Sequence, residues 1–365
     1  MIGESEAFGW TEDMGHGRDG LDIGDRERPD GRHLPRDHSI AATLRKAYPV
    51  APADAQFRAD VVAGLDRRPQ RSIPARWFYD RHGSELFEAI TRLVDYLPAR
   101  AERALLERHG DEIRQAVGPD RAVIEFGSGS SAKTPVLLRH VEPAAYVPID
   151  ISGQYLNESA AVLASLFPEL PVLPLEADFT GPLELPTLVR SMKKLGFFPG
   201  STIGNMTASG AVDLLRTMHA MLGPGAMLVV GIDRPKDERA LIRAYDDPQG
   251  VTAAFNLNLL HRINRELGGD IPVDAFRHVA RWNVPESRIE MHLQASRAVS
   301  FVIDDRRFTM AANETIHTEN SHKYTSDTAS LLLRAGAWTP VCEWIDPRAQ
   351  FGLILAEARP AAAAP

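Results

Sequence analysis

Cysteine is almost absent from this chain of 365 residues, since Cys342 is the only one. An intrachain disulfide is therefore impossible and a zinc site built from several cysteines is excluded, which favours a reducing, cytoplasmic setting. Long apolar runs are missing too: no stretch approaches the roughly 20 apolar residues of a membrane span. The first residues are acidic and glycine-rich, where a signal peptide would be basic and then apolar. We expect neither export nor a membrane partner.

A concentration of positive charge is also lacking. The formal net charge is −8, and the basic residues are interspersed with acids. Nucleic-acid binding proteins gather lysine and arginine into a patch or stripe, so no nucleic-acid partner is expected. No exposed apolar helix stripe stands out either, which favours a monomer.

Aliphatic residues are scarce at both ends of the chain. Residues 1–44 are rich in Gly, Asp, Arg and Pro, and residues 359–365 are an Ala-Pro tail. Such segments bury too little apolar surface to offset their ordering entropy. Both are predicted to be disordered tails.

Against these absences, residues 122–150 carry a recognisable unit. A short apolar run leads to Glu125 and to a turn with Gly127 and Gly129, a helix-like segment follows at 133–140, and a second apolar run stops at Asp150. This order is typical of a β-α-β unit. Glycines let backbone amides approach a ligand, and an acid ending the second strand can accept hydrogen bonds from ribose hydroxyls. The unit predicts a cofactor that carries a nucleoside.

The glycine spacing helps to choose that cofactor. The third glycine of a dinucleotide fingerprint would fall at Ala132, and the turn is rich in small hydroxyl residues. This favours S-adenosylmethionine, which has no phosphate, over NAD. Taken alone, the stretch is also compatible with any buried strand that ends in a tight turn.

Alternating strands and helices continue after this unit and predict an α/β fold. A third strand is expected at 172–175 and is followed by Asp178 and Phe179, which suit either an adenine pocket or a helix cap beside a core ring. A fourth strand leads into a polar loop that contains Asn205, where open sheets place ligands. Before the unit, Ser84 is a candidate helix cap.

A fifth strand is expected at 226–232, and the alternation then stops near residue 236. A long helical stretch at 238–267 and alternating segments at 288–293 and 298–303 indicate an insertion or a second lobe. A helix at 327–335 and strands at 338–345 and 352–356 then bring the total to seven strands.

Five blocks, taken together and in this order, resemble the S-adenosylmethionine-dependent histidine Nα-methyltransferases of the ergothioneine pathway. They are PARWFYDRHGSELFEAITRLVDYLPAR (74–100), IEFGSGSSAKT (124–134), FFPGSTIGNMT (197–207), RAYDDPQGVTAAFNLNLL (243–260) and RIEMHL (288–293). The resemblance covers about 45–357. It implies a seven-stranded, Rossmann-like class I methyltransferase domain at 99–235 with 324–358. It also implies a discontinuous α+β substrate domain at 45–98 with 236–323.

The same resemblance implies a role for individual residues. The cofactor contacts are Gly127, Lys133, Asp150, Asp178 and Phe179. Tyr79 is expected close to the cofactor and the reacting amine, with Asn205 and Tyr245 on the α-carboxylate and amino group. Tyr96, Glu319 and Ser321 are expected around the imidazole, while Phe87 and Met291 shape the walls. A carboxylate such as Glu319 can accept from an imidazole N–H.

The implied reaction transfers the sulfonium methyl group to the α-amino nitrogen of L-histidine, up to three times, without a metal. Asn205 and Tyr245 would orient the amino acid, and Tyr79 or a water would accept the departing proton. Three alternatives stay open: a methyltransferase of another aromatic amino acid such as tryptophan, a catalytically silent protein that binds histidine or S-adenosylmethionine, and an NAD-dependent dehydrogenase.

Overall fold

The computed structural model describes residues 52–129, 133–346 and 350–358, which belong to one compact unit, Ala51–Pro365. The expected tails at 1–44 and 359–365, and Ala132 in the turn, lie outside the described residues. The division of the remainder into two domains stays a prediction. Among the described helices, none is long and apolar enough to cross a membrane.

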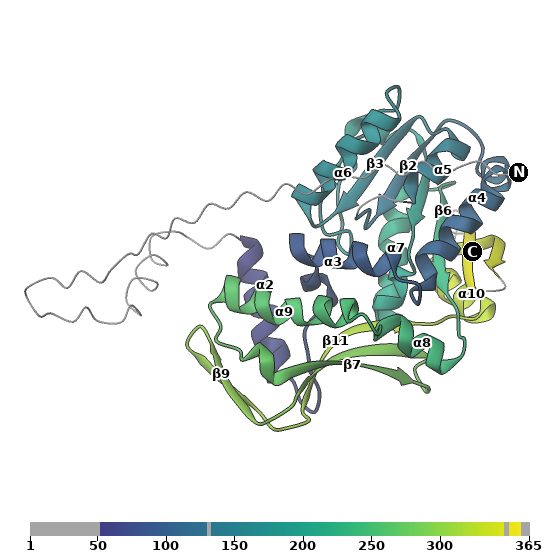
Figure 1. The fold of residues 1–365 in the computed structure, drawn as a ribbon. Coiled ribbons are helices and arrows are strands. Elements are labelled where there is room, and N and C mark those ends of the chain that lie inside the picture. Colours follow the sequence, from purple (N-terminus) through teal and green to yellow (C-terminus); the bar gives the residue numbers. More distant parts are fainter. Residues whose placement is uncertain (1–51, 130–132, 347–349, 359–365) are drawn as a thin grey trace, which may run out of the picture. The chain divides into compact units, whose positions relative to one another are not determined.

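A seven-stranded sheet forms one layer of the molecule, as expected for the α/β class (Figure 1). Its strands in spatial order are β12 (Trp338–Asp346), β13 (Phe351–Ala358), β6 (Met227–Asp233), β5 (Lys193–Phe198), β2 (Arg121–Phe126), β3 (Ala145–Asp150) and β4 (Leu175–Glu176). β13 runs antiparallel to both of its neighbours, and the other described pairs from β6 to β4 are parallel. This is the sheet of a class I methyltransferase, so the predicted fold class is confirmed.

Helices cover both faces of this sheet, and its central strands are therefore buried on both sides. The helices are α4 (Leu97–Val117), α5 (Thr134–Val141), α6 (Gly153–Leu166), α7 (Ala208–Leu222) and α10 (Ser326–Ala335), with short 3-10 turns η2 (Thr187–Val189) and η3 (Thr202–Asn205). Leu215 of α7 and Leu333 of α10 share one apolar core, whereas Leu106 of α4 and Leu137 of α5 share another.

A second, four-stranded sheet has the order β1 (Arg71–Ser72), β11 (Thr315–His322), β8 (Arg288–Ala295) and β7 (Phe276–Asn283). A separate hairpin joins β9 (Val299–Ile303) to β10 (Arg306–Met310). The elements that accompany this sheet are α2 (Pro52–Asp66), η1 (Ala75–Phe78), α3 (Arg81–Arg92), α8 (Glu238–Tyr245), α9 (Val251–Leu267) and η4 (Val273–Ala275). In Figure 1, α9 lies along the sheet, and Phe255 and Leu259 join the sheet residues in a third apolar core.

Three local predictions were wrong. Asp80, not Ser84, caps α3: its Oδ1 accepts from the Gly83 amide at 2.7 Å, while Ser84 is buried inside the helix. The helical stretch at 238–267 is two helices, because Pro248 has no amide proton to donate and Gly250 takes a φ of +73°. The third strand is Leu175–Glu176, preceded by an isolated bridge between Val172 and Tyr146.

A bulge in β11 decides which of its side chains point toward Asn205 and which point away from it. Its pairing with β8 shifts between His317, opposite His292, and Glu319, opposite Met291. Thr318 is the extra residue, and its Oγ1 donates to Asn256 Oδ1 at 2.8 Å. Alternate residues of a strand normally share a face, but a bulge reverses this relation. His317 and Glu319 therefore point to opposite faces of the sheet.

Candidate active site

The glycine turn after β2 is tied to the neighbouring strand by its own backbone. The amides of Gly127 and Ser128 donate to the Ile149 carbonyl at 2.9 and 3.1 Å. Gly127 and Gly129 have φ values of +71° and +51°, which side chains disfavour. Asp150 Oδ2 accepts from the Gly129 amide at 2.9 Å. The turn and the acid that the sequence singled out thus form one hydrogen-bonded unit.

Phe179 lies against this turn. A Cβ atom added at Gly127 would come within 3.4 Å of its ring, and the ring packs edge-on against Phe126 and Phe198. Asp178 Oδ1 accepts from the Thr180 amide at 2.9 Å, its Oδ2 pairs with Arg76 at 3.3 Å, and the side chain is half-exposed. A carboxylate beside a ring, next to backbone without side chains, fits the adenosine half of S-adenosylmethionine.

Lys133 has a partner that the sequence did not indicate. Its ammonium pairs with the fully buried carboxylate of Glu102, which also accepts from the Gly200 amide at 2.9 Å. The contact ties the start of α5 to α4 and to the loop before η3. A contact between Lys133 and the cofactor stays a prediction.

The acid at the end of β2 is deeply buried. Glu125 accepts from Thr134 Oγ1 at 2.8 Å and from the Tyr146 hydroxyl. Burial raises its pKa to about 7, although these hydrogen bonds oppose the shift. Glu125 therefore joins β2, β3 and α5 beneath the glycine turn.

Four aromatic side chains form a connected row: Tyr79 follows η1, Phe87 lies in α3, Tyr96 precedes α4 and Tyr245 ends α8. The ring centroids are 5.7 Å apart for Tyr79 and Phe87, 6.4 Å for Phe87 and Tyr96, and 6.1 Å for Tyr96 and Tyr245. All three contacts are edge-to-face, the geometry that ring quadrupoles favour. The structure thus brings Tyr79, expected near the reacting amine, into contact with three residues that the resemblance assigned to the amino-acid substrate.

Asn205 and Glu319 meet although 114 positions separate them. Asn205 Nδ2 donates to Glu319 Oε1 at 3.1 Å. Burial raises the pKa of the Glu319 carboxyl to about 7, and the charge of Lys323 opposes that shift. At neutral pH this group is therefore poised between a proton acceptor and a proton donor.

A buried polar cluster continues from there along β11. The hydroxyls of Tyr245 and Ser321 are 2.7 Å apart, and Lys323 Nζ donates to both, at 3.0 and 2.7 Å. Lys323 also pairs with Asp233 at 2.8 Å, and Lys236 pairs with the same carboxylate at 2.5 Å. The sequence reasoning missed Lys323, although a strand places residues 319, 321 and 323 on one face.

The Tyr79 ring packs edge-on against Phe87 and Phe255, with centroids 5.7 and 5.8 Å apart. Burial, and then the charge of Glu319, raise the pKa of its hydroxyl well above the usual value. The phenol is therefore neutral near pH 7, a hydrogen-bonding group rather than a phenolate base.

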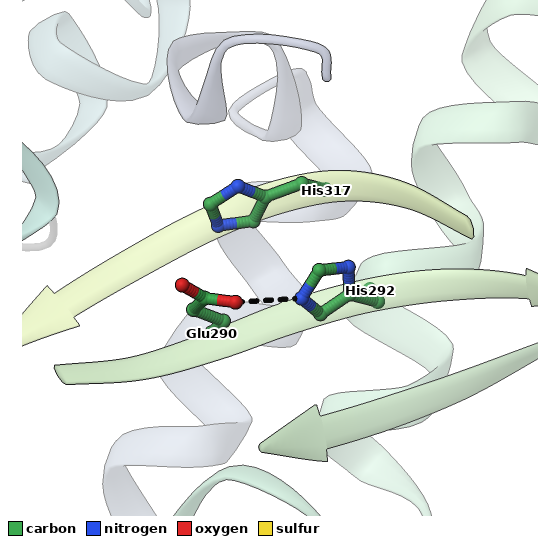
Figure 2. A group of neighbouring side chains, drawn as sticks. All are labelled: Glu290, His292 and His317. Carbon is green, nitrogen blue, oxygen red and sulfur yellow. Dashed lines mark hydrogen bonds and ion pairs between the residues drawn. The ribbon is translucent and has the colours of Figure 1, made fainter. Parts of the chain in front are cut away.

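A group of possible metal ligands lies on the opposite face of the four-stranded sheet, where Glu290, His292 and His317 approach one another (Figure 2). The two imidazole rings stack with centroids 4.8 Å apart and only 19° between their planes. An imidazole binds a metal along the lone pair in its own plane, and nearly parallel, stacked planes do not meet at one ion. Glu290 Oε1 is moreover held by Arg288 at 2.7 Å. We interpret this group as a hydrogen-bonded cluster, and the absence of a metal stays a prediction.

With this geometry established, comparison with known proteins identifies relatives. Residues 57–358 match the family model "Histidine-specific methyltransferase, SAM-dependent". Histidine N-alpha-methyltransferases of Mycolicibacterium smegmatis and Mycobacterium tuberculosis are each 40% identical over 307 residues, covering 82% of this chain and 94% of the relative. An L-tryptophan methyltransferase of Psilocybe serbica is 25% identical over 332 residues, covering 82% of this chain and 92% of the relative.

Proposed function

Because the chain belongs to the SAM-dependent, histidine-specific methyltransferase family, we propose that it converts L-histidine to its Nα-trimethyl betaine, hercynine, a step of ergothioneine biosynthesis. The observation that carries the proposal is the meeting of Asn205 with Glu319 at 3.1 Å and of Tyr245 with Ser321 at 2.7 Å. Family membership also removes the dehydrogenase alternative.

When bound, S-adenosylmethionine supplies an electrophilic methyl group on a sulfonium sulfur. The residues that would hold it are the backbone of the turn at Gly127, Lys133, the Asp150 carboxylate on the ribose hydroxyls, and Asp178 with Phe179 at the adenine. Two features of Gly127 support this arrangement: its φ of +71°, which side chains disfavour, and the Phe179 ring within van der Waals reach of it.

Histidine would lie with its α-carboxylate on Asn205 and Tyr245 and its imidazole near Tyr96, Glu319 and Ser321. Phe87 and Met291 would form walls, and Met291 is opposite Glu319 in the β8–β11 register. An imidazole has two ring nitrogens, so polar groups at both edges satisfy it. Glu319 would accept from one of the two.

The amino nitrogen must be neutral to attack, because its lone pair forms the new N–C bond as the S–C bond breaks. Holding nitrogen, carbon and sulfur in line supplies most of the acceleration. The departing proton passes to water, because the neutral Tyr79 phenol can accept a hydrogen bond from the amine but cannot hold a second proton. Each transfer removes one N–H donor, and water around the nitrogen tolerates this loss.

The test is mass spectrometry of the product after purified protein is incubated with histidine and isotopically labelled S-adenosylmethionine. Accumulation of a histidine with three labelled methyl groups is expected. Arrest after one group would contradict the trimethylation step, and binding of both ligands without turnover would identify a silent binding protein.

A second candidate substrate is tryptophan, because the Psilocybe serbica relative is an L-tryptophan methyltransferase. Glu319 discriminates between the two, since a substrate without a donor at that place would leave its second carboxyl oxygen without a partner, at a cost of about 1–3 kcal/mol. We therefore expect a kcat/KM about 5- to 150-fold higher for histidine. Equal or reversed values would remove histidine as the substrate.

We also propose a cytoplasmic monomer that needs no metal. The single cysteine supports the compartment. Light scattering after gel filtration measures the oligomeric state, and activity after dialysis against a chelator measures the metal requirement. A dimeric mass, or activity lost to the chelator and restored by one metal, would correct these points.

A further inference from the structure

Lys323 is enclosed by groups of the proposed amino-acid site. Its side chain is fully buried, and its ammonium reaches Ser321 Oγ at 2.7 Å, Asp233 Oδ2 at 2.8 Å and the Tyr245 hydroxyl at 3.0 Å. An ammonium has three protons and no acceptor. Three acceptors therefore take up its full donor capacity, and the orientation of the side chain is determined.

This arrangement restricts where the two hydroxyl protons point. Tyr245 and Ser321 each accept from Lys323, and one of them donates to the other across 2.7 Å. If Ser321 donates to Tyr245, the Tyr245 proton is directed to a third group; in the opposite case the Ser321 proton is. Either way, the pair offers one O–H donor to a ligand, a polarity that an uncharged residue at 323 would not impose.

The charge around Lys323 has the sign that attracts a carboxylate. Asp233 is buried and lies between two ammonium groups, those of Lys236 and Lys323, so these three residues carry one net positive charge. Lys323 Nζ also lies 4.6 Å from the centroid of the Tyr245 ring. A buried positive excess next to a hydroxyl donor suits a carboxylate.

We propose that Lys323 is a positioning residue of the amino-acid site: it orients the hydroxyls of Tyr245 and Ser321 so that one proton is presented to the bound amino acid, and its charge favours the α-carboxylate. The inference rests on the proposed function for the identity of the ligand. It extends that function to a residue that touches the substrate only through other side chains.

The test is Lys323→Met, which keeps the length of the side chain and removes its charge and donors. With S-adenosylhomocysteine saturating, calorimetry should show a Kd for histidine about 10- to 100-fold higher, the range for losing hydrogen bonds to a charged group. The KM should rise in parallel. The Kd of S-adenosylhomocysteine should stay within about twofold, because Lys323 contacts none of the cofactor residues named above.

Lys194→Met is the matched control. Lys194 is also buried, but its ammonium donates to the Arg190 and Met192 carbonyls at the start of β5. If both variants weaken histidine binding equally, loss of any buried ammonium explains the effect and the proposal is wrong.

A double-mutant cycle separates positioning from general stability. In a Tyr245→Phe background, Lys323→Met should add less than about threefold to the histidine Kd, because one hydroxyl that it orients is already gone. The proposal would be overturned if the effects of the two substitutions on the histidine Kd multiplied. It would also be overturned if S-adenosylhomocysteine binding weakened as much as histidine binding. Asp233 loses one of its two cations in Lys323→Met, and that loss could prevent folding. In that case the double variant Lys323→Met/Asp233→Asn, which removes both members of the pair, is measured in the same assays.

Failure of the proposed function can be distinguished from failure of the role proposed for Lys323. A wild-type chain that binds histidine and transfers no methyl group contradicts the reaction, while the binding comparison still tests Lys323. A wild-type chain that turns over, with a Lys323→Met variant of equal Kd, contradicts only the role of Lys323.

Discussion

The cofactor side and the amino-acid side of this molecule are built in different ways. On the cofactor side, the glycine turn and Asp150 belong to one β-α-β unit that is continuous in sequence. Backbone amides make most of the contacts between them. The amino-acid side collects side chains from Tyr79, Asn205, Tyr245 and the strand that carries Glu319. The contacts proposed for the cofactor thus come largely from local backbone, whereas those proposed for the substrate come from side chains of distant segments.

If the two sides are independent, a variant on one side should leave binding on the other unchanged. Asp150→Ala should have the largest effect, since this carboxylate holds the Gly129 and Ser152 amides at 2.9 Å each and is proposed to hold the ribose. We expect calorimetry to show about a 100-fold loss of S-adenosylhomocysteine affinity. Asp150→Asn, which keeps one acceptor oxygen, should lose less. If both variants lost as much affinity for histidine as for S-adenosylhomocysteine, the two sides would not be independent.

Asn205→Ala tests the amino-acid side. It removes a donor proposed for the α-carboxylate and also the contact with Glu319 Oε1 at 3.1 Å. The histidine Kd should rise about 30-fold, while the S-adenosylhomocysteine Kd changes less than about twofold. Asn205→Asp, similar in shape but negative, should be worse than alanine because it repels the carboxylate. Unchanged histidine affinity in either variant would show that the carboxylate lies elsewhere.

The smallest expected effect concerns stability. The folded-state pKa of Glu319 is about 7, against 4.5 for the ordinary group. Between these values the unfolded chain has released the proton and the folded chain keeps it, so stability falls as pH rises from 4.5 to 7 and stays lower above 7. Glu319→Gln should therefore stabilise the protein by about 1–2 kcal/mol at pH 8 and by little at pH 4.5.

Denaturant unfolding at the two pH values measures this difference. The S-adenosylhomocysteine affinity of Glu319→Gln serves as the control and should be unchanged. A gain in stability that is equal at both pH values would mean that the buried carboxyl does not titrate as described.

The sequence predicted regular elements well where the pattern was local. Strands, the glycine turn and Asp150 follow from apolar runs and glycines, and the seven-stranded sheet was expected from their order. Errors arose where neighbouring residues competed for one structural role, such as a helix cap, or interrupted a helix. Asp80 took the cap expected at Ser84 because its carboxylate reaches the Gly83 amide, and Pro248 with Gly250 divided one expected helix into two.

Among the expected amino-acid residues, Glu319 and Ser321 came from family resemblance, because their surroundings read as a solvated turn. Nothing local in that segment indicates a bulge at Thr318, which depends on the contact with Asn256 62 positions away. Without the bulge, His317 and Glu319 would share a face, and Glu319 would not lie opposite Met291. Lys323 likewise gains its importance only from Asp233 and Tyr245.

By itself, therefore, the sequence determined the fold class, the nucleoside cofactor and the chain segments that supply a site. Periodicity, glycine and the order of elements are local properties, and they are sufficient for that. Only the tertiary structure decided which carboxylate faces Asn205, which ammonium orients Tyr245 and Ser321, and which histidines stack on the far face of the sheet. These are contacts between distant residues in a buried environment, where the neighbours of each group set its charge and hydrogen bonds.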